Sequence, residues 1–226
     1  MDVMRHKDGR GVRMTAVGIL PIKEHSQRVP GKNFRLLQSK QLYKWTLDAL
    51  VGARICDAVV INTDCPDRFR GLLPPAVAQV RAPELLGDEV SMNRVIGQVV
   101  AEYPADYYIQ VHASNPFVTA DLLRSVAQAF ESGLLRYYDS VFSVTEHYAR
   151  FYQGNVAVNH DPDNLAQTQD LTPLYQENSS FYLFRRKAFC GSGRRLCGTM
   201  RGVVISRKSA WDIDTLEDWR MAERLA

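Results

Sequence analysis

The sequence predicts a three-layer α/β fold whose central sheet is mostly parallel. Short apolar runs of strand length alternate with longer segments of helical period, an order typical of such folds. Polar residues also gather in four places just after predicted strands or near their ends: residues 21–33, 62–64, 112–115 and 212–214. Ligands of open α/β sheets bind at the carboxyl ends of the strands, so we expect these clusters to converge on one cleft.

The spacing of apolar residues places the individual elements. Strands are expected at residues 15–20, 58–61, 107–111, 140–144, 181–184 and 203–205. Helices are expected at residues 41–51, 90–103, 120–131 and 215–225, the third with Thr119 as its N-cap. Residues 151–175 are polar and weakly periodic, so we expect this stretch to leave the sheet within an arm that spans approximately residues 145–178. Residues 178–180 precede the next strand, and a turn is one of two interpretations of them.

Length and composition favour one globular domain. The chain has 226 residues, of which 46% are hydrophobic and 23% charged, values that are ordinary for a soluble protein. The domain is expected to span residues 14–226, after a polar and basic stretch, residues 1–13, that is interpreted as a flexible tail. Phe34 and Trp45 are expected in the core.

Several functional classes are disfavoured by the same composition. The net charge is only +3 and the basic residues form no long run, which argues against a nucleic-acid partner. No apolar run reaches the roughly 18 residues of a membrane span. The four cysteines form no Cys-x-x-Cys pair, which favours reduced thiols and a cytoplasmic location.

The loop after the first predicted strand carries the strongest functional signal. Residues 21–33 include three cations, Lys23, Arg28 and Lys32, together with Gly31, which lets the backbone approach a ligand closely. Arginine grips phosphate oxygens in pairs and lysine acts as a mobile charge, so the loop is expected to bind a nucleoside triphosphate. The spacing does not match a Walker A motif. The alternative is a surface loop with solvated cations.

A pair of carboxylates lies near the C-terminus. Asp212 and Asp214 flank one residue of an extended segment, so their side chains are expected on the same side. Two carboxylates suit Mg²⁺, which takes few protein ligands and completes its shell with phosphate and water. The alternative is a helix cap in which Asp214 and Glu217 form an acidic capping box and Asp218 complements the helix dipole.

Other polar residues have more than one interpretation. His112 is a candidate general base, although a histidine at a strand end is more often a structural contact. Asn178, Ser179 and Ser180 either contact a ligand or only form a turn.

Six segments in one order carry a resemblance to a known family. They are residues 26–33, 81–91, 139–144, 169–173, 177–182 and 212–218. The first resembles the Ser-x-Arg-Leu-Pro-Gly-Lys of the KDO cytidylyltransferases, and the last resembles the Ile-Asp-Ile-Asp-Thr-x-Glu-Asp of the acylneuraminate (sialic acid) cytidylyltransferases. From residue 14 to residue 226 the chain is similar to these enzymes, which implies a Rossmann-like nucleotidyltransferase fold with a small dimerisation arm.

The resemblance implies a role for each matching residue. Catalytic contacts to the triphosphate fall to Lys23, Arg28 and Lys32. Nucleotide contacts fall to Ser26, Gln27, Gly31, Asn33, Arg81 and Ser91. Acceptor contacts fall to His112, Ser114, Asn115, Gln169, Asn178 and Tyr182. Asp212 and Asp214 are implied to bind Mg²⁺, and the partners are CTP, a small acidic acceptor and a second copy of the chain in a homodimer.

The implied reaction is CMP transfer. An acceptor oxygen attacks the α-phosphate of CTP and displaces pyrophosphate, with catalysis by positioning and charge neutralisation. Mg²⁺ on the two carboxylates would bridge phosphate and acceptor and lower the acceptor's pKa.

Departures from the family pattern occur in both halves of the site; the nucleotide half is largely kept, and the acceptor half is altered. Lys23 and Gln27 replace an arginine and a lysine of the sialic acid enzymes, and His112 replaces their acceptor-binding glutamine. Thr168 stands where they have an arginine that binds the sugar acid of a neighbouring subunit. The acceptor therefore stays open between a sugar acid and a phosphonate, whose own oxyanion could attack without a base.

Two other classes remain as alternatives. One is a non-catalytic nucleotide-binding homologue, which the Gln27 departure motivates. The other is a glycosyltransferase, which would need an Asp-x-Asp in the middle of the chain rather than near its end.

Overall fold

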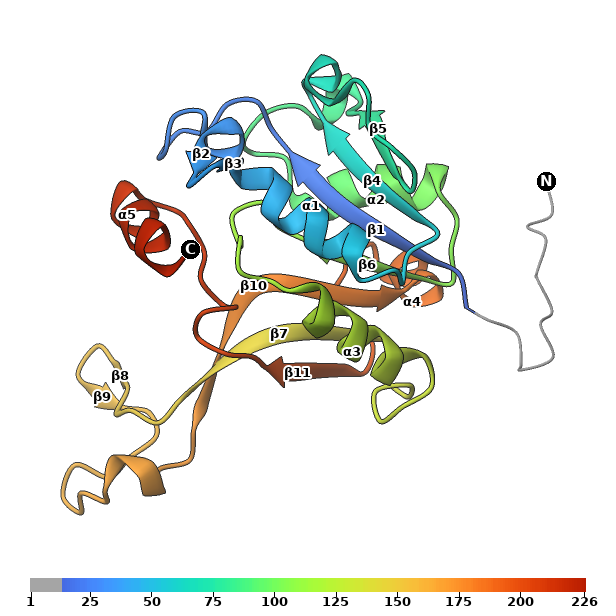
Figure 1. Ribbon diagram of the computed structural model, residues 1–226. Helices are drawn as coiled ribbons and strands as arrows, with labels where there is room; N and C mark the ends of the chain where they lie inside the picture. The colour runs from blue at the N-terminus through green and yellow to red at the C-terminus, as the bar shows by residue number, and fades with distance from the viewer. Residues whose placement is uncertain (1–13) are drawn as a thin grey trace.

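A seven-stranded sheet forms the centre of the molecule (Figure 1). The computed structural model describes residues 14–226, so the predicted tail at residues 1–13 lies outside the described residues. The strands are β1 (Ala16–Ile22), β4 (Ala58–Thr63), β5 (Ala76–Val80), β6 (Tyr107–Val111), β7 (Ser140–His147), β10 (Leu174–Arg185) and β11 (Met200–Val204). Their order is β11-β7-β10-β6-β1-β4-β5, and β10 is antiparallel to both of its neighbours while the other pairings are parallel. The predicted three-layer, mostly parallel architecture is confirmed.

Helices cover both faces of the sheet. On one face α1 (Leu42–Gly52) and α3 (Ala120–Glu131) pack against inward-facing residues of β1, β4 and β6. On the other face α2 (Met92–Glu102) and α4 (Arg186–Ser192) pack in a second apolar cluster. A Cβ on Gly18 of β1 would lie 2.8 Å from Leu50 Cδ2, so glycine allows the close packing of α1 on the sheet.

The last helix, α5 (Leu216–Leu225), lies beside the loop that follows β1. Its Trp219 is buried with Val29 and Ile213 in a third apolar cluster, which joins the C-terminus to the opening loop. The cap differs from the predicted alternative. Thr215 Oγ1 accepts from the Asp218 amide at 3.1 Å and Asp218 Oδ2 accepts from the Thr215 amide at 2.7 Å, so the capping box is Thr215–Asp218 rather than Asp214–Glu217.

Strands β7 and β10 run beyond the sheet into a projecting arm (Figure 1). The arm carries a short hairpin of β8 (Tyr152–Gln153) and β9 (Val156–Ala157) and a 3₁₀ turn, η4 (Thr168–Asp170). The interpretation of residues 178–180 as a turn is wrong, because these residues lie inside β10 at a bulge between Glu177 and Tyr182. Ser179 there has φ 60°, a left-handed conformation that favours glycine.

Strongly patterned elements agree with the predictions and weakly patterned ones were missed. The strand 107–111 and the helix 120–131 with its Thr119 cap have the predicted bounds. Edge strand β5 and the seven-residue helix α4 were not predicted, nor was the small ribbon of β2 (Leu36–Leu37) and β3 (Lys40–Gln41). Phe34 and Trp45 are partly buried against the apolar clusters. Within residues 14–226, no helix has the length and apolarity needed to cross a bilayer.

Candidate active site

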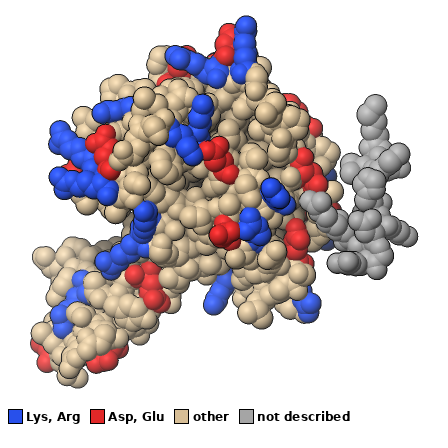
Figure 2. Space-filling view, in the orientation of Figure 1, with Lys and Arg blue, Asp and Glu red and all other residues tan. Residues whose placement is uncertain are grey.

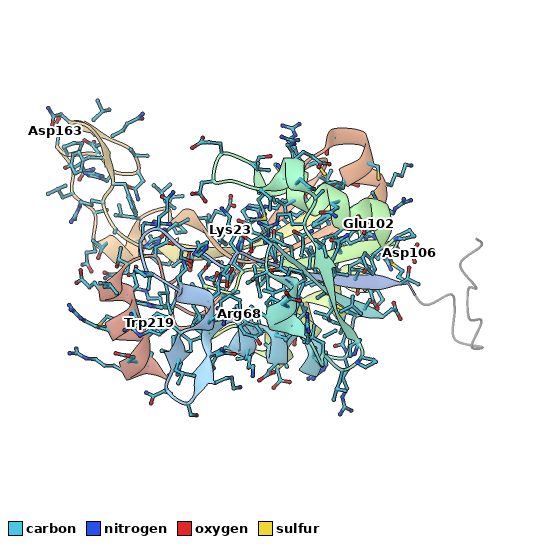
Figure 3. All side chains as sticks on the ribbon, turned by 90° about the horizontal axis from the view of Figure 1, so that it is seen from above. Lys23, Arg68, Glu102, Asp106, Asp163 and Trp219 are labelled. Atoms are coloured by element: carbon cyan, nitrogen blue, oxygen red, sulfur yellow. The ribbon has the colours of Figure 1, made fainter. Side chains whose placement is uncertain are left out.

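The opening loop at the carboxyl end of β1 lines a pocket of about 410 Å³. The loop is closed by the Asn33 side chain, whose Nδ2 donates to the Lys23 carbonyl at 2.8 Å. Gly31 has φ 63° and ψ 20° at the start of the turn η1 (Lys32–Phe34), which is why glycine suits this position. The lining residues come from the loop, from residues 81–95 and from the end of β6, and include Ser26, Gln27, Arg28, Lys32, Arg81, His112 and Ser114. Figure 3 shows Lys23 at the centre of the body, with Asp163 at the distant end of the arm.

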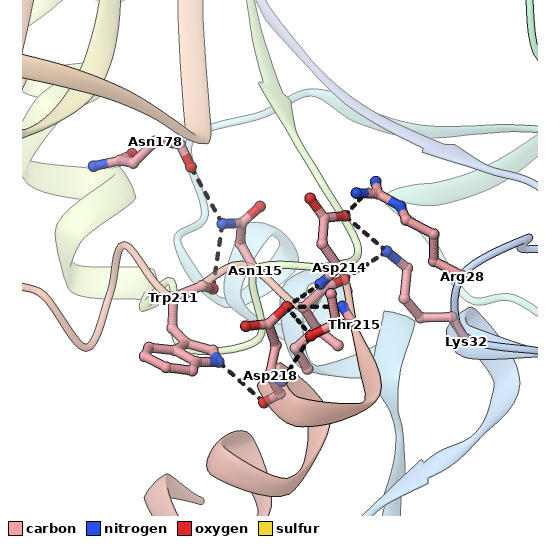
Figure 4. A network of polar contacts seen from close by, with 9 residues as sticks. Arg28, Lys32, Asn115, Asn178, Trp211, Asp214, Thr215 and Asp218 are labelled. Atoms are coloured by element: carbon pink, nitrogen blue, oxygen red, sulfur yellow. Dashed lines mark hydrogen bonds and ion pairs between the residues drawn. The ribbon is translucent and has the colours of Figure 1, made fainter. Parts of the chain in front are cut away.

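The three cations of the loop each face an oxygen of another segment. Lys23 Nζ lies 2.6 Å from Asp88 Oδ1, and Arg28 Nη2 lies 2.7 Å from Asp214 Oδ1. Lys32 Nζ donates to the Ile213 carbonyl at 2.6 Å and lies 3.6 Å from Asp214 Oδ1 (Figure 4). The hydrogen bond and charge of Lys23 lower the pKa of Asp88. The pairs of Lys23 and Arg28 are exposed and contribute little to folding, whereas the Lys32 side chain is largely buried.

Basic and acidic groups alternate on this face of the protein. Figure 2 shows Lys and Arg interspersed with Asp and Glu rather than gathered in one positive field.

Arg81 forms the buried floor beside the loop. Its Nε donates to Asn62 Oδ1 at 2.7 Å, and its Nη2 donates to the carbonyls of Asn62 at 3.0 Å and Ile22 at 3.3 Å. Burial lowers the pKa of Arg81, against a smaller opposing effect of Asp64. Ser91, the other nucleotide candidate of this region, occupies the N-cap of α2 between the pocket residues Val90 and Met92.

The carboxylate pair lies opposite the loop cations. Ile213 between the two is fully buried, and its amide donates to the Ser114 carbonyl at 2.9 Å, which fixes the segment to the end of β6. Asp212 Oδ1 is buried and has no hydrogen-bond partner among the described residues. Burial raises the pKa of Asp212, nearby Asp214 raises it further, and a hydrogen bond with Ser114 opposes the rise. A partly dehydrated carboxylate with a free oxygen beside a second carboxylate suits a divalent cation.

The capping geometry leaves these two carboxylates outside the helix cap. Because Asp218 serves Thr215, Asp214 contributes only its backbone amide, which donates to Asp218 Oδ2 at 3.0 Å. Within residues 14–226, no group of three or more His, Cys, Asp or Glu side chains is placed to hold a metal. Any cation at this pair would take its remaining ligands from phosphate and water.

The His112 ring is held in its neutral form. Arg195 Nη1 donates to Gln110 Oε1 at 2.7 Å, so the amide nitrogen of Gln110 faces His112 Nε2, 2.9 Å away. His112 Nε2 must then accept, which places the ring proton on Nδ1. Burial first, then the charges of Arg195 and Lys32, lower the pKa of His112 to about 3. This geometry disfavours His112 as a general base.

The remaining acceptor candidates are held in the framework. Asn115 is fully buried, and its Nδ2 lies 3.3 Å from the Trp211 carbonyl and 3.5 Å from the Asn178 carbonyl (Figure 4). Asn178 Nδ2 donates to Thr145 Oγ1 at 3.0 Å. Gln169 lies on the exposed arm, away from the pocket of its own chain.

Tyr182 is also buried, on β10 opposite Gln110 of β6. Its hydroxyl bonds Glu177 and lies 3.1 Å from Ser179 Oγ. Burial raises the pKa of Tyr182 to about 12.

Sequence reasoning missed Arg195 and Gln110. Both lie beside His112, and Arg195 Cζ lies 3.7 Å from the centre of the Tyr182 ring. Gln110 sits in an otherwise apolar strand, and this polar residue in a buried run was the available signal. Arg195 follows α4 in a loop with a second arginine beside it, and no local pattern distinguishes it.

Comparison with known proteins identifies the family. A family model described as "Cytidylyltransferase" matches residues 17–222. The chain belongs to the cytidylyltransferase family. Family membership confirms the predicted class of enzyme and its nucleotide, CTP.

Individual relatives are distant. The pseudaminic acid cytidylyltransferase of Campylobacter jejuni is 25% identical over 218 residues, 92% of this chain and 94% of that one. An N-acylneuraminate cytidylyltransferase of Oncorhynchus mykiss is 30% identical over 211 residues, 88% of this chain but 47% of that protein, so this cytidylyltransferase spans about half of its length. The fold is similar to that of a CMP:2-keto-3-deoxy-manno-octonic acid synthetase in complex with CTP, with a TM-score of 0.66, 14% identity and 93% and 98% of the two chains covered.

Proposed function

We propose that this cytidylyltransferase transfers CMP from CTP to a small sugar acid and releases pyrophosphate. The observation that carries the proposal is the meeting of the opening loop, which lines the pocket, with the carboxylate segment beside it, where Arg28 and Lys32 both approach Asp214. Cations for a triphosphate and carboxylates for its metal are thereby within reach of each other. The relatives named above act on sugar acids, which supports the acceptor class.

The chain's own residues would act mainly by position and charge. Lys23, Arg28 and Lys32 would exchange their carboxylate and carbonyl partners for the β- and γ-phosphates and offset the charge of the leaving pyrophosphate. The acceptor oxygen forms a bond to the α-phosphorus as the bond to the bridging oxygen breaks. Arg81 and Asn33 would keep the loop and the nucleotide end of the pocket in shape.

The metal proposal concerns Asp212 and Asp214, which would hold Mg²⁺. The buried oxygen of Asp212 without a partner is the observation that fits a cation there. Bound Mg²⁺ would neutralise phosphate charge and favour ionisation of the acceptor hydroxyl. Chelation of divalent cations should abolish pyrophosphate release from CTP, and Mg²⁺ should restore it. Activity that survives chelation would contradict a metal role for the pair.

A phosphonate acceptor is the second candidate, and the state of His112 favours it. With its Nε2 occupied and its pKa lowered to about 3, His112 is a poor base for a hydroxyl acceptor. A phosphonate oxyanion attacks without losing a proton. Measuring CMP-product formation with N-acetylneuraminate, KDO and methylphosphonate separates the candidates, since turnover of sugar acids alone would eliminate the phosphonate.

The same assay tests for a non-catalytic homologue. Pyrophosphate release from CTP in the presence of an acceptor, lost in Asp212→Ala and Asp214→Ala, would exclude that class. Binding of CTP without any product from a broad acceptor panel would favour it and contradict the proposed transfer.

We also propose that two copies associate through the arm. Tyr148, Tyr152, Val156 and Tyr175 expose large apolar surface along β7–β10 and its hairpin, which supports burial against a second copy. Light scattering should give twice the chain mass, and Tyr152→Glu with Val156→Glu should give a single chain. A monomeric wild-type protein that is fully active would contradict the dimer.

A further inference from the structure

Arg195 is a cation that the assignments above leave without a function. It lies in the loop between α4 and β11, beyond the segments that carry the family resemblance. Its Nη1 donates to Gln110 Oε1 at 2.7 Å, and its guanidinium stacks on the Tyr182 ring at 3.7 Å. Its backbone amide donates to Asn93 Oδ1 at 3.2 Å, which ties the loop to α2. Three elements therefore fix this one side chain in place.

The guanidinium has no carboxylate partner of its own. Among residues 14–226, none of the ion pairs within 4.0 Å includes Arg195. Glu177 is the nearby carboxylate that acts on it electrostatically, but Glu177 is bonded to the hydroxyl of Tyr182. Burial lowers the pKa of Arg195, so an anion bound beside it would stabilise its charged form.

Arg195 lies directly behind a residue that lines the pocket. The side chain is only partly buried by its solvent exposure, and Nη1 lies 3.5 Å from His112 Nε2. His112 lines the pocket next to Ser114, at the end of β6. The guanidinium therefore lies on the β6–β10 side of the pocket, separate from the loop cations on the β1 side.

The neighbours of Arg195 leave donors available. Gln110 bonds one of the five N–H groups of Arg195 and the Tyr182 hydroxyl is a further hydrogen-bond partner, so the remaining groups are available. The imidazole turns its accepting Nε2 toward Arg195, so the guanidinium is the group of this cluster that can recognise a carboxylate or phosphonate. Without a ligand, the contact of three polar side chains, those of Gln110, His112 and Arg195, would be less favourable at this position than apolar packing.

We propose that Arg195 binds the anionic group of the acceptor, and so supplies from the pocket's own chain a charge that Thr168 on the arm does not supply. The inference rests on the proposed CMP transfer and narrows its acceptor to an acid whose oxyanion lies over the end of β6. Gln110 is then a positioning residue, and Tyr182 is the platform on which the guanidinium rests.

Three variants test the role of Arg195. Arg195→Met keeps length and contact with the Tyr182 ring but removes the charge, and Arg195→Lys keeps the charge but removes the paired donors. Arg194→Met, at the exposed neighbouring arginine, is the matched control. We expect Arg195→Met to raise the KM for the acceptor roughly 10- to 100-fold, with a smaller rise in Arg195→Lys and an unchanged KM for CTP. Equal rises in both KM values, or no rise, would overturn the proposal.

A binding measurement separates this proposal from the proposed function. Calorimetry with CMP and Mg²⁺ present measures binding of N-acetylneuraminate, KDO and methylphosphonate without turnover, and CTP binding is measured in parallel. If the wild type binds one acid and Arg195→Met loses it while CTP binding stays, Arg195 is the anchor even where no product forms. If wild type and Arg195→Met bind the acids equally, or the wild type binds none of the three acids, the Arg195 proposal fails. CTP binding measured in parallel then tests the nucleotide part of the proposed function independently. Should Arg195→Met not fold, Arg195→Lys carries the same comparison.

Discussion

The two halves of the candidate site are built on opposite plans. On the side proposed for the nucleotide, loop cations such as Lys23 and Arg28 meet single carboxylates at the surface. On the side proposed for the acceptor, Asn115, Asn178 and Tyr182 are buried and bonded to the framework. Substitution of an exposed loop cation should therefore change the free energy of unfolding little. Substitution of a buried residue on the other side should lower both the stability of the fold and the specificity for the acceptor.

The largest expected effect is on the nucleotide side. Lys32→Gln should lower kcat/KM for CTP roughly 10²- to 10³-fold, because Lys32 faces the carboxylate segment where phosphate charge is neutralised. Pyrophosphate release measures the effect, and Lys40→Gln, which breaks an ion pair with Asp48 instead, is the control. Equal activity of the two variants would remove Lys32 from the proposed mechanism.

A pH titration tests the acceptor side. The pKa of His112 is lowered from its ordinary 6.5 to about 3, so below pH 6.5 the unfolded chain takes up a proton that the folded chain refuses. The contribution of neutral His112 to the free energy of unfolding should be fully present above pH 6.5 and be lost as the pH falls. The loss should reach about 2 kcal/mol at roughly pH 4.5, after allowance for the partial exposure of the ring.

Replacement of the ring isolates this contribution. Denaturant unfolding should show a shallower loss of stability at low pH in His112→Asn than in the wild type. His25→Gln, at an exposed histidine, is the control. Identical pH profiles of His112→Asn and the wild type would show that His112 does not carry the effect.

A smaller loss is expected at the buried amide. Asn115→Ala leaves the carbonyls of Trp211 and Asn178 without this donor, and should lower the free energy of unfolding by about 1.5 kcal/mol. Urea unfolding of this variant is compared with Asn164→Ala, an exposed asparagine on the arm. A loss of stability no greater than in that control would mean that the hydrogen bonds of Asn115 to Trp211 and Asn178 do not stabilise the fold.

The smallest effect is expected at Arg28. Arg28→Gln breaks an exposed pair with Asp214, so the free energy of unfolding should change by less than about 0.5 kcal/mol. The KM for CTP should nevertheless rise, because Arg28 is proposed to bind the triphosphate. If Arg28→Gln lowered the free energy of unfolding but left the KM for CTP unchanged, Arg28 would have a structural role and would not bind the triphosphate.

Local pattern accounts for what the sequence could predict. Residues 107–111 and 120–131 were predicted because a continuous apolar run and a strong helical period act within one element. The opening loop and the 212–214 segment were recognisable from charge and spacing. Parallel strands that end at one edge account for the pocket that the opening loop shares with residues 112–114.

Contacts between distant residues account for what it could not. Arg195 owes its place to Gln110, 85 residues earlier in the chain. The bulge in β10 depends on pairing with β7, and a sequence rich in Asn and Ser predicted a turn instead. The cap of α5 lies one residue later than the alternative interpretation had it, so the Asp214 carboxylate stays outside the cap and pairs with Arg28 and Lys32.

Strand β10 carries the arm, the bulge and Tyr182 on one continuous backbone, and this limits how the protein can change length. Adding or deleting one residue between the arm and the bulge would move each following side chain to the opposite face of the sheet. Insertions in the exposed segment 158–167 would leave that order intact. We therefore expect changes of length to be tolerated in the outer loop of the arm and to be selected against in β10, whose Tyr182 contacts Arg195.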